Sequence, residues 1–97
     1  MELEGQVALI SGGTRGIGRG IAEAFIAEGA NVVINGRSAD KGAQAIEEMN
    51  AGDQAHFIAG DVTSQEVCEG LVDQTVERYG KIDILVPNAG GGTIEGE

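Results

Sequence analysis

Short apolar runs alternate with longer amphipathic segments along this chain of 97 residues. The runs are rich in Val, Ile and Leu, are bounded by Gly, Asn, Asp or Pro, and cover residues 7–10, 31–34, 55–59 and 82–86. Nearly continuous apolar character is typical of parallel strands that are covered on both faces. Such alternation gives parallel strands joined by right-handed crossovers. The sequence therefore predicts an α/β fold with the order β-α-β-α-β-α-β.

The three segments between these runs have apolar residues at helical spacing. We expect Gly29 and Gly80 to end the first and third helices, because glycine readily adopts the left-handed conformation at a helix C-terminus. Gly42 interrupts the second segment and weakens its helical pattern. Thr63 followed by Glu66 forms a capping-box pattern, which predicts that Thr63 is the N-cap of the third helix.

Charge and cysteine content exclude several functions. Sixteen acidic and six basic side chains give a net charge of −10, which argues against general affinity for nucleic acid or anionic membranes, because both attract Lys and Arg. The one cysteine, Cys68, has no partner for an internal disulfide, and no residue cluster suggests a metal site. We see neither a signal peptide nor a run approaching the ~20 apolar residues of a membrane span. We therefore expect a soluble, cytoplasmic protein.

Glycine makes up 17 of the 97 residues, and four of them gather where the first predicted strand meets the first helix. Residues 11–18 read Ser-Gly-Gly-Thr-Arg-Gly-Ile-Gly. A phosphate group needs backbone amides aimed at it with no β-carbon in the way, and a helix N-terminus supplies free N–H groups. This strand–loop–helix arrangement predicts binding of a dinucleotide phosphate. The alternative is an ordinary connection that happens to use glycine.

The glycine loop resembles that of the classical short-chain dehydrogenases/reductases. Its motif is Gly12-x-x-x-Gly16-Ile17-Gly18, and Ser11 keeps the hydroxyl of the threonine common in that family. Three further stretches match the same family, and each follows an expected strand. They are Asn35-Gly36-Arg37, Asp61-Val62 and Asn88-Ala89-Gly90.

The resemblance covers essentially the whole chain. It implies the first half of a Rossmann-type, doubly wound parallel sheet with the strand order 3-2-1-4. Residues 1–97 would then be the N-terminal dinucleotide-binding half of such a domain, and residues 90–97 a Gly-rich acidic tail.

Residues after the second expected strand distinguish two cofactors. A free 2′-hydroxyl is usually held by an acidic residue there, whereas a 2′-phosphate calls for arginine. Gly36 and Arg37 stand at this place, the first acidic residue is Asp40, and Arg37 offers a forked donor. Arg15 can approach the same phosphate, and four of the six basic residues lie between positions 15 and 41. NADP(H) is therefore predicted over NAD(H), unless both arginines are merely solvated surface residues.

The resemblance also implies contacts with the rest of the cofactor. The Asp61 carboxylate would accept a hydrogen bond from the adenine amino group, and the N–H of Val62 would contact the ring. The alternative role for Asp61 is a simple turn or capping aspartate. The implied cofactor-binding residues of the glycine loop are Gly12, Thr14, Arg15, Gly16, Ile17 and Gly18.

A fourth cofactor-binding segment follows the last expected strand. By resemblance, Asn88, Ala89 and Gly90 would shape the wall beside the ribose and the nicotinamide. Pro87 replaces the first asparagine of the family's Asn-Asn-Ala-Gly segment. Because proline donates no hydrogen bond within a sheet, we expect the strand to end at Val86.

The family's chemistry is hydride transfer between the nicotinamide and a carbonyl or alcohol carbon. The resemblance implies that its catalytic tyrosine, lysine, serine and asparagine would all lie beyond the fourth strand. We therefore assign no catalytic and no metal-binding residue in this chain and expect it to be inactive by itself. His56, Cys68 and Tyr79 are interpreted as packing or surface residues.

The leading prediction is the cofactor-binding portion of an NADP(H)-dependent short-chain oxidoreductase that interconverts a carbonyl and a secondary alcohol on a small molecule. The resemblance also implies a homo-oligomer. A 3-oxoacyl-carrier-protein reductase and an alcohol, sugar or steroid dehydrogenase all remain open. One alternative is a truncated module that binds a nucleotide or a partner without turnover. Another is a fragment that has lost binding as well.

Overall fold

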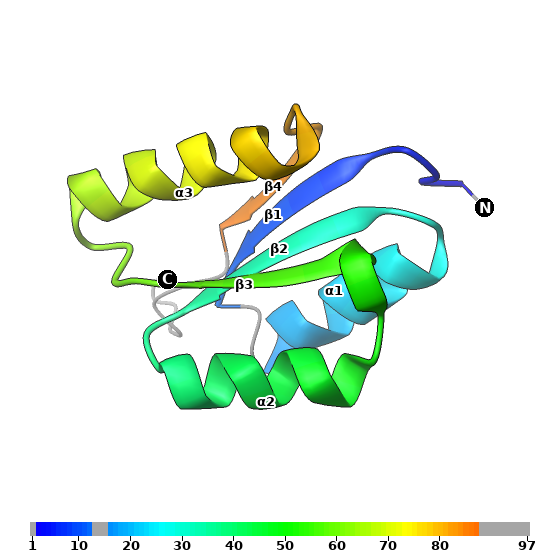
Figure 1. The fold of residues 1–97 in the computed structure, drawn as a ribbon, viewed down its shortest axis with the longest axis horizontal. Coiled ribbons are helices and arrows are strands. Elements are labelled where there is room, and N and C mark those ends of the chain that lie inside the picture. The colour runs from blue at the N-terminus through cyan, green and yellow to red at the C-terminus, as the bar shows by residue number, and fades with distance from the viewer. Residues whose placement is uncertain (1, 13–15, 88–97) are drawn as a thin grey trace.

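The computed structural model describes residues 2–12 and 16–87 of the chain. Strands and α-helices alternate along these residues, as the apolar runs predict (Figure 1). The elements are β1 (Val7–Ser11), α1 (Gly16–Ala27), β2 (Asn31–Gly36), α2 (Ala39–Met49), the short 3₁₀ helix η1 (Gly52–Gln54), β3 (Ala55–Ala59), α3 (Gln65–Tyr79) and β4 (Ile84–Pro87).

The described strands form one parallel sheet in the order β3-β2-β1-β4, which confirms the expected order 3-2-1-4. Ser11 at the end of β1 lies opposite Asn35 on one side and Pro87 on the other. Asn35 in turn lies opposite Ile58 of β3. The carboxyl ends of the four strands therefore meet at a single edge of the sheet.

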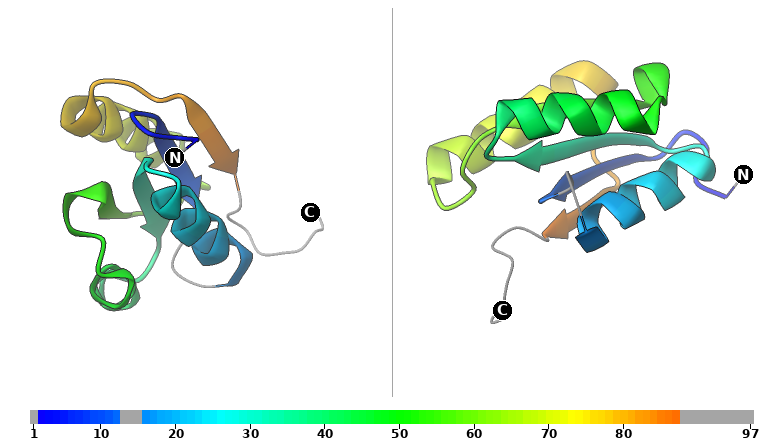
Figure 2. Two further views of the ribbon diagram at one scale, coloured as in Figure 1. Left: turned by 90° about the vertical axis from the view of Figure 1, so that its right-hand side faces the viewer. Right: turned by 90° about the horizontal axis from the view of Figure 1, so that it is seen from below.

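Helices cover both faces of the sheet: α1 and α2 lie on one face and α3 on the other (Figures 1 and 2). The buried residues on the first face are Ala8, Ile10, Ala22, Ala30, Val32, Ile34 and Ala45. Those on the second face are Leu9, Val33, Ile58 and Leu71. Consecutive residues of β1 and β2 are thus buried on opposite faces, which explains why their apolar runs are almost continuous.

Glycine ends α1 and α3 as expected. Gly29 has φ +94°, and the N–H groups of Gly29 and Ala30 donate to the carbonyls of Ile26 and Phe25, each at 3.0 Å. This pair of bonds is the Schellman arrangement. Gly80, with φ +88°, donates its N–H to the carbonyl of Val76. Both glycines therefore satisfy helix carbonyls that would otherwise lack donors.

The start of α3 differs from the capping-box prediction. Ser64 is the N-cap, and its hydroxyl oxygen accepts the N–H of Val67 at 3.4 Å. Thr63 instead donates its N–H and its hydroxyl to Oδ1 of Asp61, at 3.0 and 2.8 Å. The prediction that Thr63 caps this helix is therefore wrong, because Asp61 engages Thr63 in a turn of its own.

Two further expectations are corrected at Pro87 and Gly42. β4 begins at Ile84 and ends at Pro87 rather than Val86, and Pro87 stands opposite Ser11 in the register. Proline is tolerated there because it is the last residue of a strand at the edge of the described sheet. Gly42 does not interrupt α2, which is continuous around it. A β-carbon at Gly42 would overlap the ring of Phe57, so glycine allows α2 to pack closely against β3.

This packing predicts opposite effects of one substitution at two helical glycines. Gly20→Ala in α1 should raise the free energy of unfolding by about 0.5–1 kcal/mol, because alanine is the better helix former and its β-carbon would meet no atom within 4 Å. Gly42→Ala should lower it by about 1–3 kcal/mol through the clash with Phe57. Urea unfolding measures both values, and adding Phe57→Leu to Gly42→Ala should restore part of the loss. Equal stabilisation by both alanines would show that Gly42 is not required for the packing of α2 against Phe57.

Candidate cofactor-binding site

The glycine loop leaves the carboxyl end of β1 and leads into the first turn of α1. Gly12 and Gly16 have φ values of +71° and +64°, which residues with a β-carbon rarely adopt. A β-carbon at Gly16 would meet no atom within 4 Å, so the backbone there is open to a close approach. Ile17 is 76% exposed, whereas Gly18 is buried in the helix. These features fit an anion held at the N-terminus of α1.

Five predicted site residues lie outside the described part of the chain. Two belong to the glycine loop and three to the segment after β4. They are Thr14, Arg15, Asn88, Ala89 and Gly90.

Arg37 and Asp61 come together beside the carboxyl ends of β2 and β3. Gly36, the last residue of β2, stands opposite Ala59, the last residue of β3, so the segments that follow them start side by side. The Arg37 side chain is 80% exposed, and its Nη1 lies 3.8 Å from Oδ2 of Asp61. The fold thus brings Arg37, which is expected to bind the 2′-phosphate, next to Asp61, which is expected to bind the adenine. No acidic residue follows β2 directly at this edge.

Asp61 is held as a carboxylate by its neighbours. The backbone N–H and the hydroxyl of Thr63, followed by the guanidinium of Arg37, hold the pKa of the Asp61 carboxyl below its ordinary value. Oδ1 accepts both bonds from Thr63, while Oδ2 faces Arg37. Val62, the next residue in the chain, is half-buried and packs against the core under α3. The turn formed by residues 61–63 therefore presents an oriented acceptor at neutral pH.

The order of these causes predicts which substitution changes the acidity of Asp61 most. Thr63→Val removes the hydroxyl donor and should raise the pKa of Asp61 toward its ordinary value. Arg37→Ala should raise it by a smaller amount, because the guanidinium is exposed and 3.8 Å away. NMR titration of the Asp61 carboxyl carbon measures both pKa values. A larger shift for Arg37→Ala would show that the ion pair, and not the turn, controls this carboxylate.

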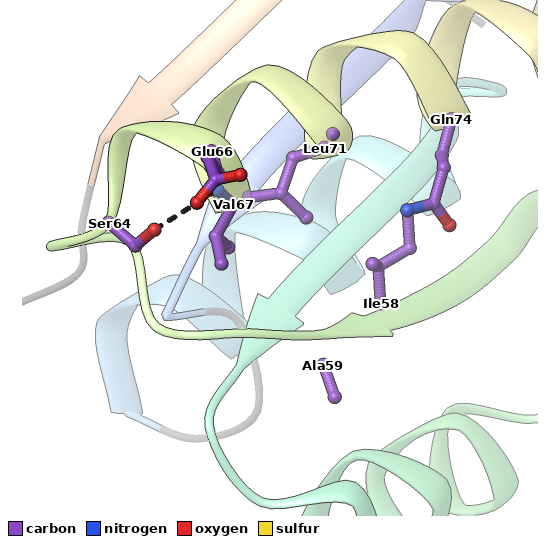
Figure 3. Close-up of a pocket in the computed structure, with 8 residues that line it drawn as sticks. Ile58, Ala59, Ser64, Glu66, Val67, Leu71 and Gln74 are labelled. Carbon is purple, nitrogen blue, oxygen red and sulfur yellow. Dashed lines mark hydrogen bonds between the residues drawn. The ribbon is translucent and has the colours of Figure 1, made fainter.

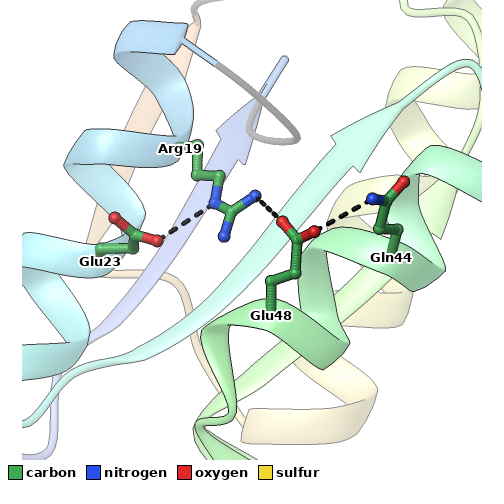
Figure 4. A network of polar contacts seen from close by, with 4 residues as sticks. All are labelled: Arg19, Glu23, Gln44 and Glu48. Carbon is green, nitrogen blue, oxygen red and sulfur yellow. Dashed lines mark hydrogen bonds and ion pairs between the residues drawn. The ribbon is translucent and has the colours of Figure 1, made fainter.

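Arg19 does not add its charge to this site. Its guanidinium donates to Oε2 of Glu23 at 3.1 Å and to Oε1 of Glu48 at 2.6 Å, and Gln44 donates to the other oxygen of Glu48 (Figure 4). The hydrogen bond from Arg19, followed by that from Gln44, lowers the pKa of Glu48. Arg19 therefore links α1 to α2 and is balanced by two carboxylates. Of the three basic residues between positions 16 and 41 that the structure describes, Arg37 is the one that forms an ion pair with Asp61.

The residues interpreted as non-catalytic lie away from this edge or make structural contacts. The Tyr79 hydroxyl donates to the carbonyl of Asp53 at 2.6 Å, and the Arg78 guanidinium lies 5.5 Å from the centre of the Tyr79 ring. His56 is half-buried in β3, and burial, followed by the charge of Arg78, lowers its pKa below the ordinary value. The exposed Cys68 thiol donates to the carbonyl of Val62 at 3.1 Å.

A pocket of about 330 Å³ opens between β3 and α3 (Figure 3). Its walls include Ile58 and Ala59 on the strand and Val67, Leu71 and Gln74 on the helix. None of the predicted cofactor-binding residues that the structure describes lines this pocket, although Ala59, the last residue of β3, does. Within residues 2–12 and 16–87, no cluster of three or more His, Cys, Asp or Glu side chains is placed to hold a metal ion. In the same segments, no helix has the length and apolar character needed to cross a membrane.

One polar residue at this edge has a role that the sequence motif does not reveal. Asn35 is only 1% exposed, and its side-chain amide donates to two backbone carbonyls after and within β3. Motif comparison includes it only as the residue before Gly36 and Arg37. The signal in the sequence that could have revealed this role is an amide at the end of an apolar run. A buried amide costs free energy unless it is hydrogen-bonded, so an amide at such a position indicates specific hydrogen bonds.

Comparison with known proteins assigns the family. The family profile described as short chain dehydrogenase matches residues 6–97. Among solved structures, a short chain dehydrogenase from Bacillus anthracis has a TM-score of 0.86 and 37% identity, covering 92% of this chain and 36% of that one. The glucose dehydrogenase of Caenorhabditis elegans in its apo form also has a TM-score of 0.86, with 34% identity over 95% of this chain and 40% of that one. The chain therefore belongs to the short-chain dehydrogenase/reductase family, whose Rossmann-type sheet it shares.

Curated relatives from bacteria are oxidoreductases with different substrates. A cis-2,3-dihydrobiphenyl-2,3-diol dehydrogenase of Paraburkholderia xenovorans is 43% identical over 90 residues, which are 93% of this chain and 32% of the relative. An NADP-dependent (R)-specific alcohol dehydrogenase of Lentilactobacillus kefiri is 42% identical over 88 residues, with 91% and 35% covered. The chain thus spans about a third of the length of these relatives.

Proposed function

We propose that this chain is the cofactor-binding portion of an NADP(H)-dependent oxidoreductase that interconverts a carbonyl and a secondary alcohol on a small molecule. The observation that carries the proposal is the position of Arg37. It follows Gly36 at the carboxyl end of β2, is 80% exposed and lies 3.8 Å from Asp61. A 2′-phosphate requires a cation at this place and the absence of a carboxylate directly after β2.

The described residues fit such a cofactor at three points. Gly12 and Gly16, with positive φ values, and the N-terminus of α1 suit a pyrophosphate. The guanidinium of Arg37 suits a second phosphate group, because its parallel N–H donors match two phosphate oxygens. The Asp61 carboxylate, which stays ionised beside Thr63, suits an amino group of the adenine ring. Thr14, Arg15, Asn88, Ala89 and Gly90 belong to the same proposal.

When bound, the nicotinamide of the cofactor supplies or accepts the hydride. The proposed residues contribute by binding and orienting the cofactor. The glycine loop binds the pyrophosphate, Arg37 selects the phosphorylated ribose, and Asp61 and Val62 hold the adenine ring. Holding the adenosine end in one place restricts the reactive ring to one approach, which lowers the entropic cost of reaction. No proton-transfer step is assigned to residues 1–97.

The relatives support an oxidoreductase acting on small alcohols, but their names differ in substrate. One is described as an NADP-dependent alcohol dehydrogenase and another as a dihydrodiol dehydrogenase. The chain spans about a third of the length of these proteins. The catalytic activity of a complete enzyme is therefore proposed for this chain and is not taken from the relatives. A nucleotide-binding module without turnover is the competing function. Association into a homo-oligomer and a cytoplasmic location stay predictions.

The first test of cofactor choice replaces Arg37. Arg37→Asp should weaken NADPH binding by about 10- to 100-fold, because a charge-assisted phosphate contact is exchanged for repulsion. NADH binding should be unchanged or improved, since the new carboxylate can accept a hydrogen bond from the ribose 2′-hydroxyl of NADH. Cofactor fluorescence titrations give both dissociation constants. Lys41→Asp is the matched control: it makes the same change in net charge at an exposed position of α2. Undiminished NADPH preference in Arg37→Asp would refute the assignment.

The second test asks whether Gly16 forms part of the phosphate cradle. Gly16→Val should abolish measurable NADPH binding, because a branched side chain would fill the approach to the loop. A valine is also strained at φ +64°, so Gly52→Val serves as the control: Gly52 has φ +59°, and a β-carbon there also meets no atom within 4 Å. Both variants should lose similar stability in thermal unfolding, and only Gly16→Val should lose binding. Normal NADPH binding by Gly16→Val would overturn the proposed site.

A further inference from the structure

Asn35 is a buried amide on the face of the sheet that α3 covers. It stands opposite Ile58, and it shares the side of β2 on which Val33 is buried under α3. The neighbouring buried residues on this face, Leu9, Val33 and Ile58, are all apolar. A leucine would satisfy packing among them, whereas an amide costs free energy unless its polar atoms are bonded. The position therefore requires an explanation beyond core formation.

The Asn35 side chain provides that explanation through two hydrogen bonds. Its Nδ2 donates to the carbonyl oxygen of Ile58 at 3.0 Å and to that of Gly60 at 3.1 Å. Because both neighbours are carbonyl oxygens, the NH₂ group and not the amide oxygen must face them. The second of these carbonyls lies beyond the end of β3 and immediately before Asp61. A single side chain of β2 thus holds the exit of β3.

The backbone around Asn35 extends this connection to the other parts of the proposed site. Its carbonyl accepts the N–H of Gly12, the first residue of the glycine loop, at 2.8 Å. The following residue, Gly36, accepts the N–H of Gly60 at 3.0 Å and precedes Arg37. Asn35 therefore lies where three segments meet: the glycine loop, the turn that carries Arg37 and the turn that carries Asp61.

The path of the chain at Gly60 is confined from the other side by α3. A β-carbon at Gly60 would lie 2.6 Å from Cγ1 of Val67, so the backbone passes close to the first turn of the helix. Both polar groups of Gly60 are bonded to β2, its N–H to Gly36 and its carbonyl to Asn35. Removing the amide of Asn35 would release one of these two attachments and allow Asp61 to change direction relative to Arg37.

We infer that Asn35 is a positioning residue for the adenosine end of the cofactor, because its amide sets the direction in which Gly60 delivers Asp61 and Val62 to the site. This inference rests on the proposed function. Asn35 acts through the carbonyl of Gly60 and not by touching the cofactor itself. The sequence between Asn35 and Arg37 then combines two roles, positioning by the buried amide and selection by the exposed guanidinium.

The test compares two amides that each bond two backbone carbonyls. Asn35→Leu removes both donors with little change of shape and should weaken NADPH binding by about tenfold. Gln54→Leu is the matched control. Gln54 lies just before β3, at the opposite end of that strand from Asp61, and its amide donates to the carbonyls of Ile26 and Ala30. Its dissociation constant for NADPH should stay within about twofold of the parent value. Equal affinity of Asn35→Leu and Gln54→Leu would overturn the inference.

A double-mutant cycle separates positioning from a general loss of stability. If Asn35 acts through Asp61, Asn35→Leu should weaken NADPH binding much less in an Asp61→Ala background than in the parent protein. A merely structural role predicts the same weakening in both backgrounds, and that additive result would overturn the inference. Circular dichroism at the titration temperature establishes that each variant is folded.

A smaller substitution keeps the test decisive if Asn35→Leu does not fold. Asn35→Thr retains one hydroxyl donor and should give a loss of affinity that also disappears in the Asp61→Ala background. If the parent protein binds neither NADPH nor NADH, the proposed function fails and the inference fails with it. If the parent binds NADPH and the Asn35 variants bind equally well, the inference alone fails.

Discussion

Parallel hydrogen bonding between β1 and its two neighbours, and between β2 and β3, is the constraint on which the rest of the structure depends. The register places Ser11 opposite Asn35 and Pro87, and it places Gly36 opposite Ala59. Segments that are far apart in the sequence therefore leave the sheet at one edge, beside the N-terminus of α1. Ligands of open α/β sheets bind at this edge because loops and helix N-termini converge there. The described residues of the proposed cofactor site lie at this edge, and Asn35 is buried in the sheet next to it.

Charge at this edge differs from that of the molecule as a whole. The chain carries a net charge of −10, yet the Arg37 guanidinium stands exposed beside Asp61, while Arg19 is balanced by Glu23 and Glu48. An exposed ion pair contributes little to stability because water screens it. Arg37 can therefore exchange Asp61 for another anion at small cost. Because the net charge of the chain is negative, an exposed cation distinguishes this edge electrostatically for an anionic ligand.

Local patterns predicted the order of elements well and several details poorly. The apolar runs identified all four described strands, and Gly29 and Gly80 end their helices as expected. Thr63 matched a capping box, but Asp61 engages it in a turn and Ser64 becomes the cap. Gly42 weakened a helical pattern, yet it is needed for contact with Phe57. Each error arose where a residue from another segment, or a competing turn, outweighed the local propensity.

The sequence by itself determined the alternation of strands and helices, the glycine loop before α1 and the resemblance to a family to which the comparisons then assigned the chain. These features depend on periodicity and on motifs within a few residues. Only the tertiary structure decided that Arg37 lies 3.8 Å from Asp61 and that Arg19 is directed to α2. It also decided that the Asn35 amide bonds the carbonyl of Gly60. The physical reason is that these contacts depend on the strand register and on helix packing, which no local pattern encodes.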